Sequence, residues 1–263
     1  MDCERVVKHI VGWLGDYLGT SGAEGYAIGI SGGIDSALVS TLAAMTGARC
    51  LAAALPIRQA AAQMGRAVEH QQWLKARFPN VETACIDLTT AFEAFEGSMP
   101  VVGDPDAAGL AGANARSRLR MTALYYLAGP NGLLVAGTGN KVEDFGIGFF
   151  TKYGDGGVDV SPIADLTKTE VFRLSHWLGI VPSILEAPPT DGLFGDDRTD
   201  EQQIGASYPE LEKAMQQDAA DVSPENLTGR EREVLELYIR RNRANRHKVQ
   251  LPPECLVPDE FRK

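Results

Sequence analysis

The sequence lacks most features that define specialised protein classes. Its 263 residues include four cysteines, Cys3, Cys50, Cys85 and Cys255, and no two of them form a CxxC pair. Zinc sites and thiol redox motifs use such pairs, so neither is indicated. No apolar run approaches the ~18 residues of a membrane span, and the first residues lack the layout of a signal peptide. We therefore expect a cytoplasmic protein with free thiols and no membrane partner.

Positive charge is also in short supply. Lys and Arg total 25 against 35 Asp and Glu, which gives a formal net charge of -10. A chain this acidic does not attract nucleic acid by general electrostatics, so we expect no nucleic-acid partner. Hydrophobic residues make up 44% and charged residues 23%, as in an average globular protein, which excludes general disorder. The length alone allows one large domain or two small ones, and because no repeat or low-complexity tract divides the chain, we predict a single domain over residues 1–263.

Short apolar runs alternate with stretches of helical periodicity. The strands are predicted at 26–30, 51–55, 83–86 and 133–136. The helices are predicted at about 3–18, 36–46, 60–77, 114–128 and 168–178. This alternation is typical of a parallel sheet with helices on both faces. The predicted fold class is therefore α/β, a three-layer Rossmann-like parallel sheet.

Two T-x-x-E sequences predict helix starts in the second half of the chain. TKTE at 167–170 would begin the helix at 168–178, and TGRE at 228–231 would begin a further helix. Between them, residues 187–203 are rich in Pro, Gly and Asp and are predicted to form a loop.

The segment GISGGIDSA at 29–37 joins a predicted strand to a predicted helix. Backbone N–H groups at a helix start, beside adjacent glycines, form a cradle for an anion. The segment has neither the lysine of a Walker A loop nor the G-x-G-x-x-G of a dinucleotide fingerprint. A carboxylate inside such a cradle needs a mediating cation, so Asp35 predicts Mg²⁺ between itself and phosphate oxygens. The alternative is a tight turn in which Asp35 only caps the helix.

The SGGIDS segment at 31–36 resembles the signature of the ATP pyrophosphatase (PP-loop) superfamily. The resemblance implies cleavage of ATP between its α- and β-phosphates. It leaves amidating ligases, GMP synthetases and tRNA-modifying enzymes open.

Further blocks resemble the ammonia-dependent NAD synthetases over almost the whole chain. They are NARSRLRM at 114–121, Gly137-Thr138 with Glu143, FFTKYGDGG at 149–157, PPTD at 188–191, and His247-Lys248. The resemblance implies ATP-dependent amidation of deamido-NAD with ammonia to NAD, through an acyl-adenylate, with release of AMP and pyrophosphate. It also implies a homodimer. Because the chain has no room for a glutaminase domain, we expect it to use free ammonia or ammonia from a separate subunit.

The resemblance assigns roles to individual residues. The implied ATP-binding residues are Gly29, Ile30, Ser31, Gly32, Gly33, Ile34, Asp35, Ser36, Thr138, Lys168 and Thr190. The implied ligands of Mg²⁺ are Asp35 and Glu143. The implied contacts to deamido-NAD are Arg118, Lys152, Asp159, His247 and Lys248. The catalytic residues are expected to be Asp35, Lys168 and Thr190, and either Asp159 or Asp191 would deprotonate ammonium.

Three departures from the family pattern lie on the substrate side. Thr190 is followed by Asp191-Gly192-Leu193 in place of the usual A-D-L, and Val249 follows His247-Lys248 where many relatives have a basic residue. The segment between Glu143 and Phe149 is one residue longer than in the bacterial enzymes. An alternative therefore stays open: another PP-loop ligase that amidates a different carboxylate, such as a GMP synthetase-like core. A nucleotide sensor without turnover is a second alternative.

Overall fold

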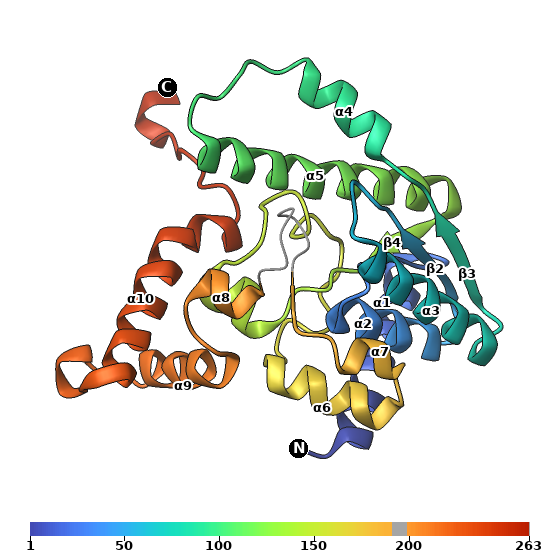
Figure 1. The fold of residues 1–263 in the computed structure, drawn as a ribbon, viewed down its shortest axis with the longest axis horizontal. Helices are drawn as coiled ribbons and strands as arrows, with labels where there is room; N and C mark the ends of the chain where they lie inside the picture. The colour runs from blue at the N-terminus through green and yellow to red at the C-terminus, as the bar shows by residue number, and fades with distance from the viewer. Residues whose placement is uncertain (191–198, 263) are drawn as a thin grey trace.

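Figure 1 shows the computed structural model of the chain, which describes residues 1–190 and 199–262. A parallel sheet in the order β3-β2-β1-β4 lies at its centre. The strands are β1 (Gly25–Gly29), β2 (Arg49–Ala54), β3 (Val81–Cys85) and β4 (Leu133–Val135). Ala27 of β1 pairs with Leu51 on one side and with Val135 on the other. The predicted α/β class is confirmed.

Helices cover both faces of this sheet (Figure 1). One face carries α1 (Cys3–Ser21), α2 (Ile34–Met45), α3 (Ala61–Arg77), α6 (Lys168–Leu178) and α7 (Pro182–Leu185). The other face carries α5 (Pro105–Ala128), with α4 (Thr89–Gly97) packed against α5. Side chains alternate along β1, so Tyr26 and Ile28 enter the core beneath α1 and α2, whereas Ala27 faces α5. Both faces of the strand are therefore buried, as in other parallel sheets.

The chain changes its direction of winding next to β1. β2 and β3 follow β1 on one side, and β4 pairs with its other side. Ligands of open α/β sheets bind at the carboxyl ends of the strands at such a switch point. The loops at 30–33 and 136–139 follow β1 and β4 and lie at this point. Ala136 also forms an isolated parallel bridge with Val160, which extends the pairing beyond β4.

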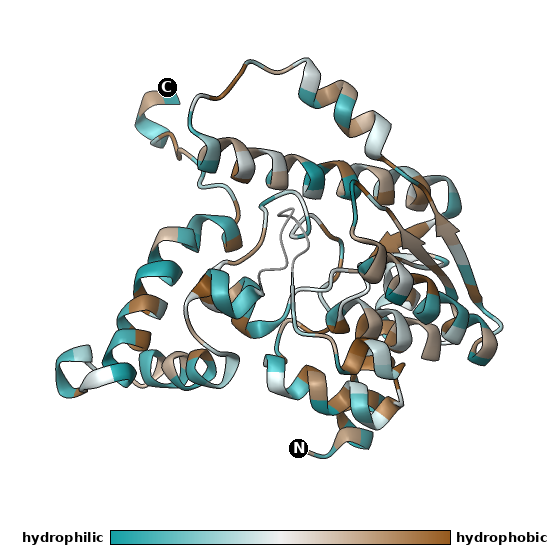
Figure 2. Cartoon of the chain, in the orientation of Figure 1, coloured by the Kyte–Doolittle hydropathy of each residue, from teal (hydrophilic) through white to brown (hydrophobic). Residues whose placement is uncertain are grey.

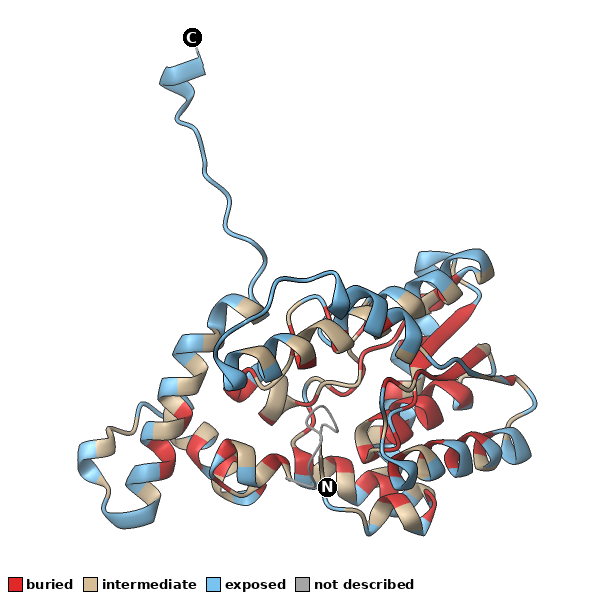
Figure 3. Cartoon of the chain, turned by 45° about the horizontal axis from the view of Figure 1, so that its top comes forward, coloured by how far each residue is buried: buried red, intermediate tan, exposed pale blue. Residues whose placement is uncertain are grey.

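A second apolar cluster lies beside the sheet. Val142, Ile147, Leu211 and Leu235 belong to it. The elements that surround it are the π-helical turn η2 (Lys141–Ile147), α8 (Asp200–Ile204), α9 (Tyr208–Ala219) and α10 (Gly229–Val249). Figure 2 shows hydrophilic residues at many positions of α9 and α10. After α10 the described residues are exposed and run away from the body as an extended arm (Figure 3).

Short 3-10 turns complete the described chain, η1 (Gly129–Asn131), η3 (Pro224–Asn226) and η4 (Asp259–Arg262). Within residues 1–190 and 199–262, none of the helices combines the length and apolar character that crossing a membrane requires. A single domain over 1–263 stays a prediction.

Two predicted helix starts need comment. The TKTE box is confirmed, because the Thr167 N–H donates to Glu170 at 2.9 Å and the Thr167 side chain accepts from the Glu170 N–H. The box at 228–231 is wrong, since Thr228 forms no side-chain cap bond. Glu231 instead accepts a bond from Lys213 on α9 at 3.0 Å, which draws its carboxylate away from the helix start.

Two helix boundaries also differ from the prediction. Helix α5 begins at Pro105 rather than 114, with Asp104 accepting a bond from the Asp106 N–H at 3.1 Å. Gly109 and Gly112 obscured these turns, because glycine lowers helix propensity. The segment 187–203 is not entirely a loop, since α8 begins at Asp200.

Candidate active site

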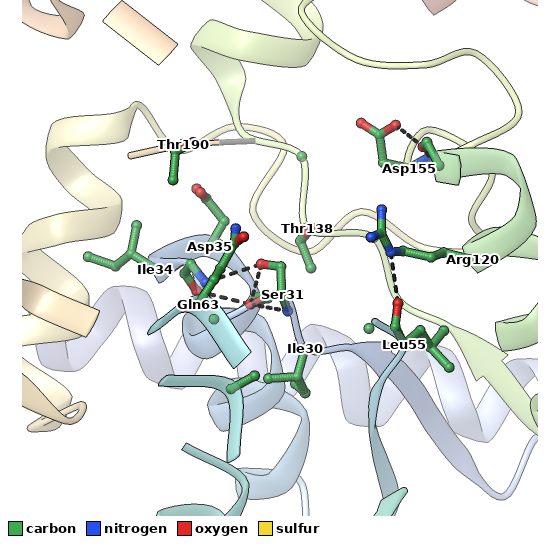
Figure 4. A pocket seen from close by; sticks show the side chains of 18 of the residues that line it. Ile30, Ser31, Ile34, Asp35, Leu55, Gln63, Arg120, Thr138, Asp155 and Thr190 are labelled. Atoms are coloured by element: carbon green, nitrogen blue, oxygen red, sulfur yellow. Dashed lines mark hydrogen bonds between the residues drawn. The ribbon is translucent and has the colours of Figure 1, made fainter. Parts of the chain in front are cut away.

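A cleft opens at the carboxyl ends of β1 and β4 (Figure 4). Its lining includes all of residues 29–36, together with Thr138, Glu143, Lys168 and Thr190. The structure therefore brings all the predicted ATP-binding residues and both predicted metal ligands to one cavity. In Figure 4, Asp35 and Ser31 lie on one side of this cavity, and Arg120 and Asp155 lie on the other.

The loop after β1 has a backbone shape that requires glycine. Gly32 has φ of 83°, and a Cβ atom there would lie 2.3 Å from the carbonyl oxygen of Gln63. The side chain of Ser31 stabilises the turn, because its Oγ accepts from the Gly33 N–H at 3.2 Å and lies 3.1 Å from Ser36 Oγ. The loop is thus shaped by its own hydroxyl groups before any ligand arrives.

Helix α2 begins directly after this turn. Gly33 is its N-cap residue, and no side chain in the described ranges caps it. The N–H groups of the first helical turn therefore point into the cleft without a side-chain acceptor, and the helix dipole adds partial positive charge at the same place. This end of the cleft suits an anion such as a phosphate group.

The charges at the cleft floor converge on one ammonium group. Lys168 Nζ donates to Asp35 Oδ2 at 2.6 Å and to Glu143 Oε1 at 2.9 Å. The Lys168 side chain is 3% exposed, and those of Asp35 and Glu143 are 18% and 13% exposed. Burial alone lowers the pKa of Lys168, but the two carboxylates outweigh burial and raise that pKa. Lys168 is therefore a buried ammonium cation between two acidic side chains.

The remaining oxygen atoms of these two carboxylates also have partners. Asn140 Nδ2 donates to Asp35 Oδ1 at 3.1 Å and to Glu143 Oε2 at 2.7 Å. The hydroxyl of Tyr208 donates to Glu143 and lies 3.3 Å from Asp200 Oδ2. These donors come from the loop after β4 and from α9, so two distant segments fix the orientation of the pair.

The donor set suits a magnesium ion. Mg²⁺ in nucleotide sites is held by one or two carboxylates, with phosphate oxygens and water completing its six ligands. Asp35 and Glu143 supply two carboxylates around one cationic group. Across residues 1–190 and 199–262, no group of three or more His, Cys, Asp or Glu side chains is placed to hold a metal. A metal here would therefore depend on this pair and on the phosphates of a nucleotide.

The opposite wall of the cleft carries a second charged group of residues. Arg120 Nε donates to the Leu55 carbonyl oxygen at 2.9 Å, and burial lowers the pKa of Arg120 to about 10, so it stays a cation. Asp155 accepts from Ser117 Oγ at 2.6 Å, and burial raises the pKa of its carboxyl above the ordinary value. A carboxylate with a raised pKa is a better proton acceptor than an exposed one.

Comparison with known sequences bears directly on this cavity. The family model described as NAD synthase matches residues 6–252, a range that contains every described residue of the cleft. This chain belongs to the NAD synthase family.

Relatives of similar length support the same membership. The NH(3)-dependent NAD(+) synthetase of Methanococcoides burtonii is 37% identical and aligns over 98% of this chain and 97% of its own. That of Methanosarcina mazei is 36% identical and aligns over 99% of this chain and 100% of its own. Among solved structures, the NMN synthetase of Francisella tularensis has a TM-score of 0.83 at 32% identity, and the match covers 98% of this chain and 99% of that one. The Campylobacter jejuni NH3-dependent NAD synthetase has a TM-score of 0.77 at 23% identity over 97% and 100%, a likeness of fold.

In this NAD synthase family member, the cleft does not include the residues predicted to contact deamido-NAD. Four of them form a separate cluster where α10 ends. Lys152 Nζ donates to the carbonyl oxygen of His247, and Arg118 Nε donates to that of Lys152 at 3.3 Å. Lys248 Nζ donates to the carbonyl oxygens of Gly148 at 2.9 Å and Phe150 at 3.0 Å.

The fifth residue, Asp159, lies apart from this cluster. Its carboxylate accepts from the Val135 N–H at 2.8 Å and from the Tyr125 hydroxyl at 2.9 Å. Both of its oxygen atoms are therefore bonded at the edge of β4. The other predicted base, Asp191, lies outside the described residues, as do Gly192 and Leu193.

Sequence reasoning missed several residues of the cleft floor and its walls. Asn140, Tyr208 and Asp155 were not singled out, and Arg120 entered only as part of the block at 114–121. A helix-start signal was present for Tyr208, because Ser207 and Glu210 form a capping box at α9. No local signal connects Tyr208 with Glu143, because the contact depends on how α9 packs.

The segment between Glu143 and Phe149, which we expect to be one residue longer than in the bacterial enzymes, begins in a widened helical turn. Residues Lys141–Ile147 form a π-helical turn rather than an α-helical one, and the Gly148 N–H donates to the Glu143 carbonyl oxygen. Bonds between residues five apart take up one residue more per ring than α-helical bonds. Both Glu143 and Phe149 still line the cleft.

Proposed function

We propose that this NAD synthase family chain amidates deamido-NAD with ammonia, using ATP and forming NAD, AMP and pyrophosphate. One observation carries the proposal. The loop at 29–36, which contains Asp35, meets the distant Glu143 in one cleft. The chain that carries this cleft matches the NAD synthase family model over residues 6–252.

The chemistry requires two steps at this cleft. The nicotinate carboxylate attacks the α-phosphorus of ATP, the bond to the β-phosphate oxygen breaks, and an acyl-adenylate and pyrophosphate form. Ammonia then attacks the activated carbonyl carbon, and AMP leaves with the electron pair of the broken carbon–oxygen bond. The protein contributes positioning and neutralisation of charge rather than a covalent intermediate.

Residues of the cleft floor would bind the triphosphate. The N–H groups of residues 32–36 and the hydroxyls of Ser31 and Ser36 would hold phosphate oxygens, with Thr138, Lys168 and Thr190 around them. Asp35 and Glu143 would hold Mg²⁺, which when bound would neutralise phosphate charge. Asp155 is placed to accept a proton from ammonium, because it lines the cleft and burial raises its pKa. Asp159 and Asp191 stay alternatives for that role.

The proposal includes a homodimer and a cytoplasmic location. Leu110 and Tyr126 on α5 are 56% and 79% exposed, which supports a second copy against this helix. The described cysteines are free thiols, which is consistent with a reducing compartment. The proposal also includes contacts with deamido-NAD from Arg118, Lys152, Asp159, His247 and Lys248. Sedimentation at the mass of one chain would contradict the dimer.

A second candidate substrate follows from one comparison. The Francisella tularensis protein with a TM-score of 0.83 is an NMN synthetase. Nicotinate mononucleotide carries the same pyridine carboxylate as deamido-NAD and lacks only the AMP half. The cations predicted to contact the dinucleotide, Lys152 and Lys248, are bonded to backbone carbonyl groups outside the cleft. We rank deamido-NAD first because the curated relatives at 36–37% identity are NAD synthetases.

One assay separates these substrates. The protein is incubated with ATP, Mg²⁺ and ammonium, and with deamido-NAD, nicotinate mononucleotide or xanthosine monophosphate, while AMP and the amide product are measured. We expect the highest kcat/KM with deamido-NAD. A preference for the mononucleotide would make the chain an NMN synthetase, and turnover of xanthosine monophosphate alone would contradict the family chemistry. Asp35→Asn is expected to remove turnover with every substrate.

A further inference from the structure

The acidic pair at the cleft floor already holds a cation, and that cation belongs to the protein. Each of the four carboxylate oxygens of Asp35 and Glu143 accepts a hydrogen bond. Asn140 and Tyr208 are neutral donors to them. Lys168 brings the positive charge, and its ammonium bonds to both side chains at once.

This position is unfavourable for a lysine unless the two carboxylates are there. Lys168 is the first residue of α6, where the helix dipole disfavours a cation, and its side chain is almost completely buried. Removal of a charge from water is costly without a partner of opposite sign. Conversely, the two carboxylates, which are only 18% and 13% exposed, would repel each other without the ammonium. The three side chains therefore form one unit in which Lys168 holds Asp35 and Glu143 together.

We infer that Lys168 is a place-holder cation that occupies the position of the divalent metal until nucleotide and metal bind together. The inference rests on the proposed function, because it takes Asp35 and Glu143 as ligands of Mg²⁺. An ammonium and a divalent ion cannot both bond to the same two carboxylates without strong mutual repulsion. The Lys168 side chain would therefore have to leave Asp35 and Glu143 for these two residues to hold a divalent ion.

The displaced ammonium has a destination in the same cleft. Lys168 lines the cavity together with Ser31 and Ser36, and a lysine carries its charge on a long, flexible stem. Its Nζ also lies 5.1 Å from the centre of the Tyr208 ring, a cation–π contact that can stabilise the ammonium when it leaves the carboxylates. When a divalent ion replaces the Lys168 ammonium at Asp35 and Glu143, the ammonium would thus become free to contact the phosphates of the nucleotide. Lys168 in this role positions the metal ligands before it contacts the nucleotide.

Direct metal binding without nucleotide tests the exchange. Mn²⁺ replaces Mg²⁺ as the probe, and its binding to the full chain is measured by electron paramagnetic resonance of the free ion. We expect Lys168→Gln to bind Mn²⁺ at least ~10-fold more tightly than the unmodified chain, because the substitution removes a positive charge next to the metal. Lys168→Arg keeps the charge and is expected to bind Mn²⁺ as weakly as the unmodified chain.

Thermal unfolding provides a second readout that does not depend on turnover. Lys168→Gln leaves two partly buried carboxylates without a cation, so its melting temperature is expected to fall in metal-free buffer and to recover with Mn²⁺. The unmodified chain is expected to show little change with Mn²⁺ alone. Lys213→Gln is the matched control, because it removes an exposed lysine that pairs with Glu231 at 3.0 Å. Its Mn²⁺ binding is expected to equal that of the unmodified chain.

Equal Mn²⁺ affinity in Lys168→Gln and the unmodified chain would overturn the inference. A Lys168→Gln chain that stays unfolded in excess Mn²⁺ would also overturn it, because a cation that the metal cannot replace is not a place-holder. These measurements contain no deamido-NAD. Failure of the product assay with intact Mn²⁺ behaviour would therefore refute the proposed substrate alone, and the reverse result would refute the exchange alone.

Discussion

The hydroxyl of Tyr208 on α9 donates a hydrogen bond to the carboxylate of Glu143 in η2, although 65 residues separate them in the chain. The same hydroxyl lies 3.3 Å from Asp200, the first residue of α8. The helices that pack beside the sheet therefore help to orient Glu143, together with Asn140 and Lys168.

Removal of this hydroxyl should weaken Mg²⁺ binding strongly and lower the stability of the fold only slightly. We expect Tyr208→Phe to need about 10-fold more Mg²⁺ for half-maximal turnover, because partners of metal ligands orient them. The free energy of unfolding should fall by about 1 kcal/mol for the lost bond. Tyr26→Phe is the control, because its hydroxyl donates to the Leu14 carbonyl oxygen at 2.8 Å away from the cleft. Equal Mg²⁺ dependence in the two variants would contradict the role of Tyr208.

The glycine with a left-handed backbone should be the least replaceable residue of the loop that follows β1. Gly32→Ala places a Cβ atom 2.3 Å from the carbonyl oxygen of Gln63 at φ of 83°. We expect a loss of about 1–3 kcal/mol in the free energy of unfolding, and loss of ATP binding measured by calorimetry. Gly65→Ala in α3 meets no atom within 4 Å and is expected to stabilise the chain by about 0.5–1 kcal/mol. An ATP affinity unchanged by Gly32→Ala would exclude a tight approach of phosphate to this loop.

The two T-x-x-E sequences should differ in their effect on stability. Thr167→Ala removes a formed capping box, so we expect a loss of about 1 kcal/mol in urea unfolding. Thr228→Ala removes no cap bond and is expected to change stability by less than about 0.5 kcal/mol. Similar losses in both variants would mean that the box at α10 forms in solution.

Buried His70 should make the fold sensitive to acid. Burial lowers the pKa of His70 to about 4, and its Nε2 lies 2.9 Å from Ser40 Oγ. An unfolded histidine has a pKa of about 6.5, so the unfolded chain binds the proton more readily between these values. The contribution of His70 is therefore complete above about pH 6.5 and decreases by about 3 kcal/mol as the pH falls through about 4.

Urea unfolding at several pH values checks this dependence. The difference between the unmodified chain and His70→Gln should shrink as the pH falls from about 7 to about 4, because the variant has no imidazole to protonate. His176→Gln replaces an exposed histidine and is expected to keep the pH dependence of the unmodified chain. Parallel curves for His70→Gln and the unmodified chain would show that His70 does not titrate on unfolding.

The sequence predicted those parts of the fold whose signals are local. Strands β1, β2 and β4 are short apolar runs, and the TKTE box begins α6 as expected. The first turns of α5 were not predicted, because glycines interrupt their helical pattern. Helix α8 was not predicted, because it lies in a segment whose composition is typical of a loop. In both places composition was a poorer guide than capping residues, namely Asp104 for α5 and Thr199 for α8.

The site was predictable as a set of residues and not as a set of contacts. Asp35, Glu143 and Lys168 were each singled out, and the structure brings them together. That Lys168 bonds to both carboxylates could not be foreseen, because the pairing joins residues 133 positions apart through the packing of α2 against α6. Tyr208 was missed for the same reason, because its contact with Glu143 joins residues 65 positions apart. Asn140 has a local signal that was overlooked, since it is the N-cap residue of η2 and lies three positions before Glu143.

The π-helical turn η2 sets the angular relation between the acidic pair and the segment that follows it. Each residue advances an α-helix by about 100°, so one added residue in α-helical form would rotate Phe149 and the next loop by more than a quarter of a circle relative to Glu143. The wider turn absorbs that rotation within residues 141–147. A residue gained or lost in this segment would therefore leave the Glu143 side chain directed at the same cavity, provided that the turn widened or narrowed with it.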